Sequence, residues 1–166
     1  MRAISMLALT LGSVAMLSGC GKKEEAVMPA APSATPAAAP ASAAPPSADQ
    51  QKMLAALPAP YNTGEAAAGE AKFAQCRSCH AIAKGAPNLT GPNLYGVFGN
   101  KAASVAGFDF SDDLKNAHLT LDAPTLDKWL ENPKSLAPQT KMTFAGLKTA
   151  QDRYDVIAFL ATQKDQ

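Results

Sequence analysis

Two cysteines and a histidine lie within one short segment of this 166-residue chain, which reads Cys76, Arg77, Ser78, Cys79, His80. Thiols three residues apart on one turn can each add to a vinyl group of a haem, and the adjoining imidazole can then bind the iron. Two cysteines, two spacers and an immediately following histidine are the spacing of c-type haem attachment. The segment therefore predicts one haem c, attached covalently through Cys76 and Cys79, with His80 as an iron ligand.

Other uses of a Cys-x-x-Cys pair fit the surrounding sequence less well. A thioredoxin-type redox pair belongs between a strand and a helix, and no run of residues alternates well enough to predict a strand. A zinc site lacks a second Cys-x-x-Cys pair, and the adjacency of His80 to Cys79 is awkward for one tetrahedral ion. A structural disulfide between Cys76 and Cys79 stays open as the alternative, although it leaves His80 without a role.

Few residues are candidates for the second axial ligand. The chain has six methionines, and five of them lie ahead of the domain that holds the cysteines: Met1, Met6, Met16, Met28 and Met53. Met142 lies within that domain, after a Pro-Gln-Thr-Lys run that predicts a non-helical segment able to present a thioether to the iron. We therefore predict Met142 as the second ligand. The alternatives are His118 or an open coordination site, with Met142 as an ordinary core residue.

The N-terminus has the pattern of an export signal. Arg2 precedes an apolar run of about fifteen residues, which is shorter than the roughly twenty residues of a membrane-spanning helix. The sequence Leu-Ser-Gly-Cys that follows resembles the bacterial lipoprotein signal, so we predict a signal peptide at residues 1–19 and a lipid on Cys20. The chain would then be anchored in the cell envelope with its domain in the periplasm. An ordinary secretory signal or an uncleaved anchor is the alternative.

Residues 20–61 have the composition of a flexible linker. Most of the thirteen prolines fall between Pro29 and Pro60, among alanine and serine, which favours extended polyproline II segments. Within this range, the stretch from Asp49 to Leu57 can form a short helix before the prolines. Residues 62–166 then form one domain. The formal net charge of +1 gives no indication of a nucleic-acid partner.

Helical patterns account for most of this domain. The Ala-rich stretch from Glu65 to about Cys79 favours a helix that leads into the cysteine segment. A second helix is predicted between Asp122, a candidate N-cap, and Pro133, which ends it. A final helix begins near Thr149, which resembles a capping box together with Asp152. The residues expected on the core faces of these two helices are Leu126, Trp129, Leu130, Val156, Ile157 and Leu160.

Three more segments, GPNLYGVFG, TLDKWLENP and TKMTFAGL, follow the cysteine segment in the order typical of one family. From about Asn62 onward, the chain resembles the class I c-type cytochromes, in the branch of mitochondrial cytochrome c and bacterial cytochrome c2. The resemblance implies an all-α cytochrome c fold, a small helical domain that wraps round one haem and has crossed N- and C-terminal helices. Gly69, Phe73 and Phe159 match the family's glycine and aromatic positions at that crossing.

The resemblance also implies roles for residues beside the haem. The carbonyl of Pro92 would accept a hydrogen bond from His80 and so fix the tautomer of the imidazole. Thr140 and Phe144 match residues that close the methionine side of the haem. Trp129 stands where the family usually has a tyrosine near the axial methionine, and its indole can donate a hydrogen bond but not accept one. The alternative is that Trp129 is only a core residue.

Three positions depart from the family pattern. The arginine, tyrosine and tryptophan that usually bond the haem propionates correspond here to Asn100, Phe110 and Leu121. That side of the haem would therefore lack three familiar polar donors. How the propionates are solvated stays open at this point.

The resemblance implies a single-electron carrier rather than an enzyme. It would contact the membrane through the lipid. Its redox partners would be a donor and an acceptor, such as a quinol-oxidising complex and a terminal oxidase or reductase. The domain is expected to be monomeric. Lys134, Lys141 and Lys148 resemble part of the family's ring of docking lysines, with an ordinary solvated face as the alternative. A haem enzyme or ligand sensor with an open site, and a permanent subunit of a redox complex, are the other function classes.

Overall fold

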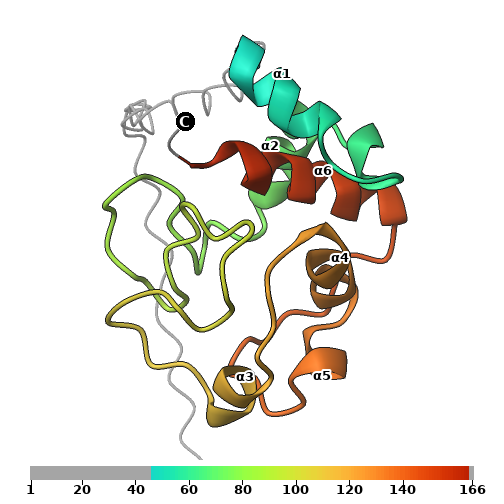
Figure 1. The fold of residues 1–166 in the computed structure, drawn as a ribbon. Coiled ribbons are helices and arrows are strands. Elements are labelled where there is room, and N and C mark those ends of the chain that lie inside the picture. The colour runs from blue at the N-terminus through green and yellow to red at the C-terminus, as the bar shows by residue number, and fades with distance from the viewer. Residues whose placement is uncertain (1–45, 165–166) are drawn as a thin grey trace, which may run out of the picture. The chain divides into compact units, whose positions relative to one another are not determined.

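The computed structural model describes residues 46–164, so the predicted signal peptide, Cys20 and the linker as far as residue 45 lie outside the described residues. No strand occurs between residues 46 and 164, and an isolated bridge joins Lys101 to Thr120. None of the helices in this range is long and apolar enough to cross a membrane. The predicted all-α class is confirmed. The helices are α1 Ala48–Ala55, the 3-10 helix η1 Tyr61–Thr63, α2 Ala66–Phe73, α3 Asp112–Asn116, α4 Ala123–Glu131, α5 Pro133–Leu136 and α6 Ala150–Thr162 (Figure 1).

Helices α2 and α6 pack directly against each other. A Cβ atom on Gly69 would lie 1.9 Å from the backbone oxygen of Asp155, so only glycine allows this approach. The rings of Phe73 and Phe159 lie beside it, with their centroids 5.2 Å apart. The close contact of backbones and the aromatic pair are the arrangement that the resemblance implies for the N- and C-terminal helices.

The predicted first helix ends earlier than expected. Helix α2 ends at Phe73, and residues 74–79 continue as turns. The amide of Cys76 donates to the carbonyl of Phe73, three residues back, at 2.8 Å. This tighter spacing is typical of a helix C-terminus that winds into 3-10 turns. The cysteine segment therefore follows the helix rather than forming its last turns.

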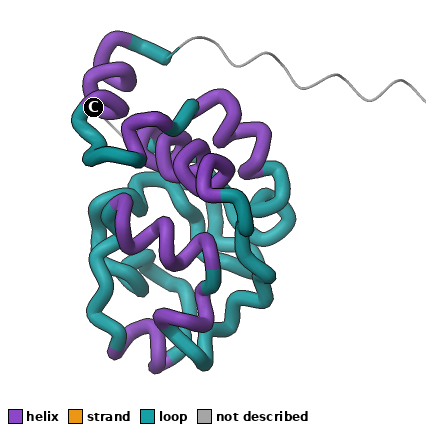
Figure 2. The backbone as a smooth tube through the Cα atoms, turned by 90° about the vertical axis from the view of Figure 1, so that its right-hand side faces the viewer, coloured by secondary structure: helices purple, strands orange, loops and turns teal. Residues whose placement is uncertain are grey.

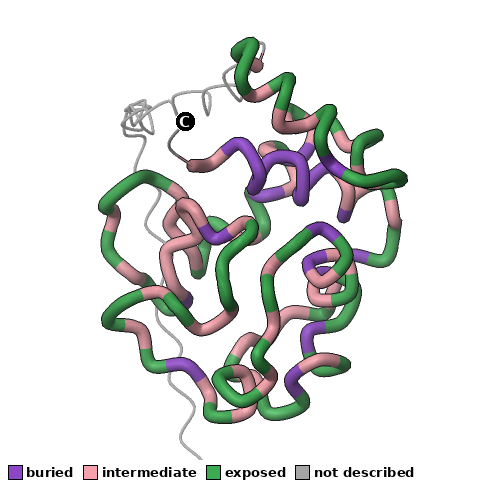
Figure 3. Tube along the Cα trace, in the orientation of Figure 1, coloured by how far each residue is buried: buried purple, intermediate pink, exposed green. Residues whose placement is uncertain are grey.

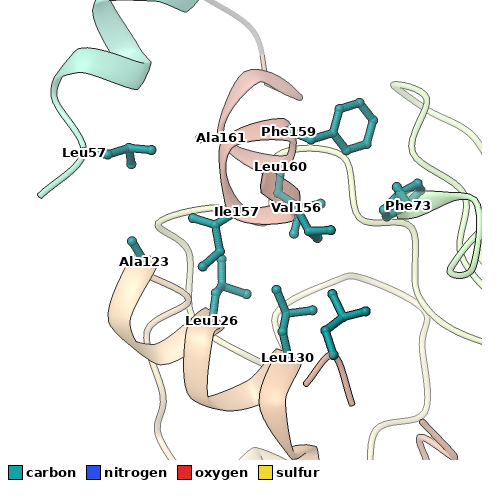
Figure 4. Close-up of a cluster of buried hydrophobic side chains, with 11 residues drawn as sticks. Leu57, Phe73, Ala123, Leu126, Leu130, Val156, Ile157, Phe159, Leu160 and Ala161 are labelled. Carbon is teal, nitrogen blue, oxygen red and sulfur yellow. The ribbon is translucent and has the colours of Figure 1, made fainter. Parts of the chain in front are cut away.

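Helix α1 extends the folded unit toward the N-terminus. Its N-cap Ser47 accepts a hydrogen bond from the amide of Gln50, whose side chain accepts one from the amide of Ser47. Leu57, just after the helix, is 7% exposed and belongs to the core cluster that includes residues of α6 (Figure 4). Part of the range 20–61, which the sequence assigns to a linker, thus packs on the domain.

Helix α4 begins and ends where the sequence predicts. The carboxylate of Asp122 accepts a hydrogen bond from the amide of Thr125 at 2.9 Å, and Pro133 opens the next helix. The capping box predicted for α6 is absent. Thr149 makes no side-chain cap, and Asp152 instead forms an ion pair with Lys72 of α2 at 2.9 Å.

Residues 81–111, here called the loop segment, contain no helix and form the long teal stretch between α2 and α3 in Figure 2. The side-chain amide of Asn93 donates to the carbonyls of Ala83 and Ala86, both at 2.9 Å. Its backbone amide donates to the side chain of Asn88. Figure 3 shows the contrast in burial, since residues 155–162 of α6 are all buried and the loop segment is mostly half-buried or exposed.

Candidate functional site

A cavity of about 310 Å³ is lined by the cysteine segment, the loop segment, α4 and the methionine segment (residues 137–149). Its wall is mostly apolar, with side chains such as Leu94, Val97, Phe108 and Leu126. Of the residues that the sequence predicts at the site, eight line this one cavity: Cys76, Cys79, His80, Pro92, Trp129, Thr140, Met142 and Phe144. The fold therefore brings together residues that lie as far as 68 positions apart in the chain.

The two cysteines lie on a turn that directly follows α2. The amides of Cys79 and His80 both donate to the carbonyl of Cys76, at 3.0 and 2.9 Å. Both cysteines are free thiols, so the structure contains no disulfide between Cys76 and Cys79, which was the alternative interpretation. Burial raises the pKa of the Cys76 thiol, and the neighbouring Cys79 adds to the effect. The segment thus presents two thiols to one cavity.

The His80 imidazole is held in one orientation. Its Nδ1 lies 2.8 Å from the carbonyl oxygen of Pro92, and because a carbonyl only accepts, Nδ1 carries the proton and donates. A Cβ atom on Gly91 would lie 2.4 Å from Cε1 of the ring, so the backbone of this loop packs directly on the imidazole. Burial lowers the pKa of His80, which outweighs the opposing effect of the hydrogen bond. Nε2 is therefore left with a free lone pair, the form in which histidine binds metals.

Met142 lies on the methionine segment, half-buried, with its amide 3.3 Å from the hydroxyl of Thr140. The segment returns along α4, where the amide of Leu147 donates to the carbonyl of Leu130 at 2.8 Å. Gly146 has a φ of +86°, and a Cβ atom there would lie 1.9 Å from the carbonyl oxygen of Glu131. Only glycine allows this path next to α4.

Arg153 fixes the end of the methionine segment, a role that sequence reasoning missed. Its guanidinium donates to the carbonyls of Leu147 and Lys148 at 3.0 and 3.2 Å, and to the carboxylate of Asp127 at 2.6 Å. Arg153 is only 7% exposed. A signal was present in the sequence, because this arginine shares the apolar face of α6 with Val156, three residues on.

The remaining predicted residues divide into two groups. Phe110 and Leu121 line the cavity, whereas Asn100 does not and donates its amide to the carbonyl of Gly96 at 2.6 Å. His118 is exposed, has a φ of 49° and does not line the cavity, which weighs against it as a ligand. The three predicted docking lysines are all exposed, and Lys141 among them also lines the cavity.

Zinc and thioredoxin-type sites find no support in residues 46–164. No group of three or more His, Cys, Asp or Glu side chains there could hold a metal ion. No strand flanks the cysteine segment, as a thioredoxin-type pair requires.

Comparison with known proteins identifies the family. The family model for cytochrome c matches residues 66–164. The chain belongs to the cytochrome c family. Cytochrome c2 of Rhodomicrobium vannielii is 53% identical over 106 residues, which cover 64% of this chain and 85% of that protein. Cytochrome c of Euglena viridis is 45% identical over 103 residues, 61% of this chain and 100% of the relative. The solved structure of cytochrome cH from Methylobacterium extorquens has a TM-score of 0.57 and 45% identity, and it covers 60% of this chain and 99% of that one.

As a cytochrome c, the chain binds one covalently attached haem c through its cysteine pair, and it is an electron-transfer protein rather than an enzyme. The residues of the cavity fit this group. Apolar walls suit the faces of a porphyrin, two thiols stand beside an imidazole with a free Nε2, and a thioether lines the same cavity. The predictions of the family, the fold and the cofactor are therefore confirmed.

Proposed function

We propose that this cytochrome c is a single-electron carrier whose iron is bound by His80 and Met142, and that a lipid on Cys20 holds it at a membrane. The observation that carries the ligand assignment is that both side chains line one cavity, where the carbonyl of Pro92 leaves Nε2 of His80 free. Of the two methionines in the part of the chain that the structure describes, Met142 lines the cavity and Met53 does not.

Two protein ligands suit an iron that only exchanges electrons. With both axial positions occupied, little ligand rearrangement accompanies a change of oxidation state, and methionine raises the reduction potential relative to a second histidine. The mostly apolar wall disfavours the extra positive charge of the ferric state, which raises the potential further. Cys79 is exposed, so the attachment side of the cofactor lies near the protein surface, where electrons can enter and leave.

Replacement of Met142 tests the ligand assignment. A ferric iron with a methionine ligand has a weak near-infrared band, and we expect Met142→Ala to lose this band and to bind carbon monoxide readily when reduced. His118→Ala is the matched control, because His118 is exposed and lies off the cavity, and this variant should keep the band. A wild-type protein that lacks the band, or a Met142→Ala variant that keeps it, would refute Met142 as the ligand.

The membrane anchor rests on the sequence of residues 1–20, and we propose that the domain lies in the periplasm. About 25 extended linker residues at about 3.1 Å each would let the domain move on the order of 80 Å from the bilayer, and so alternate between donor and acceptor. In a Gram-negative host, Cys20→Ser should move the protein from the membrane to the soluble periplasmic fraction, and the wild-type N-terminal peptide should carry acyl chains. A wild-type protein that is soluble, with an unmodified Cys20, would refute the anchor. Co-purification with an oxidase or reductase in mild detergent would identify a permanent subunit instead of a shuttle.

We also propose that Lys134, Lys141 and Lys148 contribute to partner docking. All three are exposed, but two are already engaged: Lys141 forms an ion pair with Asp109 at 2.5 Å, and Lys148 donates to the carbonyl of Ala145 at 2.8 Å. Lys134 should therefore have the largest effect on docking. Lys134→Gln should slow oxidation by an anionic inorganic oxidant, speed oxidation by a cationic one, and lose both effects at high salt. Rates unchanged for both oxidants at low salt would remove Lys134 from the docking surface.

A further inference from the structure

The charges on the cavity wall are unevenly distributed. Among residues 46–164, no aspartate or glutamate lines the cavity, and the two cationic side chains on its wall are Lys101 and Lys141. The haem c of this family has two propionate carboxylates, which need a cation or several hydrogen-bond donors when they are removed from water. The cavity therefore has to supply the counter-charge from very few residues.

The residues at the family's usual propionate-binding positions do not provide this counter-charge. Phe110 is 8% exposed and Leu121 lines the wall, and neither can donate a side-chain hydrogen bond. Asn100 uses its amide for the carbonyl of Gly96 and lies off the cavity. Uncharged hydroxyls remain, among them Ser111, but they carry no positive charge.

The two lysines differ in their partners. The ammonium group of Lys141 lies 2.5 Å from the carboxylate of Asp109 and 2.9 Å from its carbonyl oxygen, so its charge is already compensated. Lys101 has no ion pair among the described residues. It is exposed and lines the cavity, which places it where the cavity meets solvent.

The backbone beside Lys101 is held in place by hydrogen bonds to the segment that precedes α4. The amide of Ala102 donates to the carbonyl of Leu119 at 2.9 Å, and the amide of Leu121 donates to the carbonyl of Asn100 at 2.8 Å. Lys101 itself forms the bridge to Thr120. A flexible four-carbon stem on a fixed backbone can bring the ammonium group to a carboxylate at the cavity mouth.

We propose that Lys101 forms the ion pair with a haem propionate, in place of the donors that are absent at Asn100, Phe110 and Leu121. The proposal rests on the bound haem c and not on the axial ligand or the lipid anchor. Its physical consequence concerns the reduction potential. A propionate that stays ionised beside a cation contributes a constant charge, whereas an unpaired propionate titrates more easily, and its ionisation favours the ferric state.

The test compares three variants of the holoprotein: Lys101→Gln, Lys101→Arg and, as matched control, Lys128→Gln. Lys128 is exposed on α4 and does not line the cavity, so its loss changes the net charge equally without touching the site. The reduction potential is measured from weakly acidic to weakly alkaline pH, and the carboxyl carbons of ¹³C-labelled haem are followed by NMR over the same range.

We expect Lys101→Gln to lower the potential at neutral pH, to add a segment in which the potential falls as pH rises, and to move the titration of one propionate carbon to higher pH. Lys101→Arg should restore the wild-type profile, and Lys128→Gln should match the wild type. Identical profiles for Lys101→Gln and Lys128→Gln would overturn the proposal. The near-infrared band should persist in all three variants. A failure of the Lys101 proposal can therefore be told apart from a wrong assignment of Met142 as the ligand.

Discussion

The pair of helices α2 and α6 differs from the loop segment in what its side chains pack against. Those of the helix pair pack against other protein atoms, and many of those in the loop segment line the cavity. At the helix pair, backbone touches backbone through Gly69, and Phe73 and Ile157 are fully buried among protein atoms. In the loop segment, side chains such as Leu94 and Phe108 face the cavity. The helix pair therefore depends on protein packing, whereas we expect the order of the loop segment to depend also on the haem that the cavity binds.

The same difference explains how the site is assembled. The cysteine segment follows α2 directly, so a well-packed helix fixes the position of Cys76, Cys79 and His80. Met142 comes from a segment without helix, which is held at its far end by Leu147 and Arg153. One ligand is thus fixed by local structure and the other by long-range contacts.

The largest effect should come from loss of the covalent link. In the double variant Cys76→Ala and Cys79→Ala, amide hydrogen exchange should become fast throughout residues 81–111 and 137–149, because their apolar side chains lose the surface they pack on. The α2–α6 pair should keep part of its protection. Two results would contradict this contrast between the helix pair and the loop segment. One is an equal loss of protection in both regions, and the other is a loop segment that stays protected without haem.

A substitution at the helix crossing should have the next largest effect. Gly69→Ala places a Cβ atom 1.9 Å from the oxygen of Asp155, and we expect a loss of about 3 kcal/mol in the free energy of unfolding. Gly85→Ala is the control: no atom lies within 4 Å of its Cβ position, and its φ of +72° should cost only about 1 kcal/mol. Urea unfolding of both holoproteins measures the difference, and equal losses would mean that the close approach is unimportant.

Removal of Arg153 should weaken the methionine side selectively. Arg153→Met removes the ion-pair partner of Asp127, whose side chain is 20% exposed, and we expect a loss of about 2–3 kcal/mol. The near-infrared band should disappear at a lower urea concentration than the helical circular dichroism signal. Glu131→Gln is the control, since Glu131 is 58% exposed and 3.8 Å from the guanidinium, and its loss should cost less than about 0.5 kcal/mol. Simultaneous loss of the two signals in Arg153→Met would argue against a selective role.

The smallest of these effects concerns the N-terminal extension. Leu57→Ala should cost about 2 kcal/mol because Leu57 is buried in the core, whereas Leu89→Ala should cost almost nothing because Leu89 is 50% exposed. Urea unfolding of the two variants gives both values. Equal stabilities would show that residues 46–61 behave as linker despite their contacts.

Sequence reasoning succeeded where the determinants are local. The cysteine segment spans five residues, and the N-cap at Asp122 and the stop at Pro133 depend on neighbours in the chain. It missed features that depend on distant partners. The charge of Arg153 would normally indicate a solvated side chain, and only the fold brings Asp127, 26 residues away, into contact. Leu57 likewise lies in a proline-rich stretch, and its burial follows from the position of α6.

The most direct test of the whole account is the intact mass of the purified, denatured protein, recorded together with its reduced-minus-oxidised optical spectrum. The account predicts a mass increased by one haem that stays with the chain after denaturation, a c-type spectrum, and loss of both when Cys76 and Cys79 are replaced by alanine. A colourless protein, or a chain whose mass contains no tetrapyrrole, would contradict it.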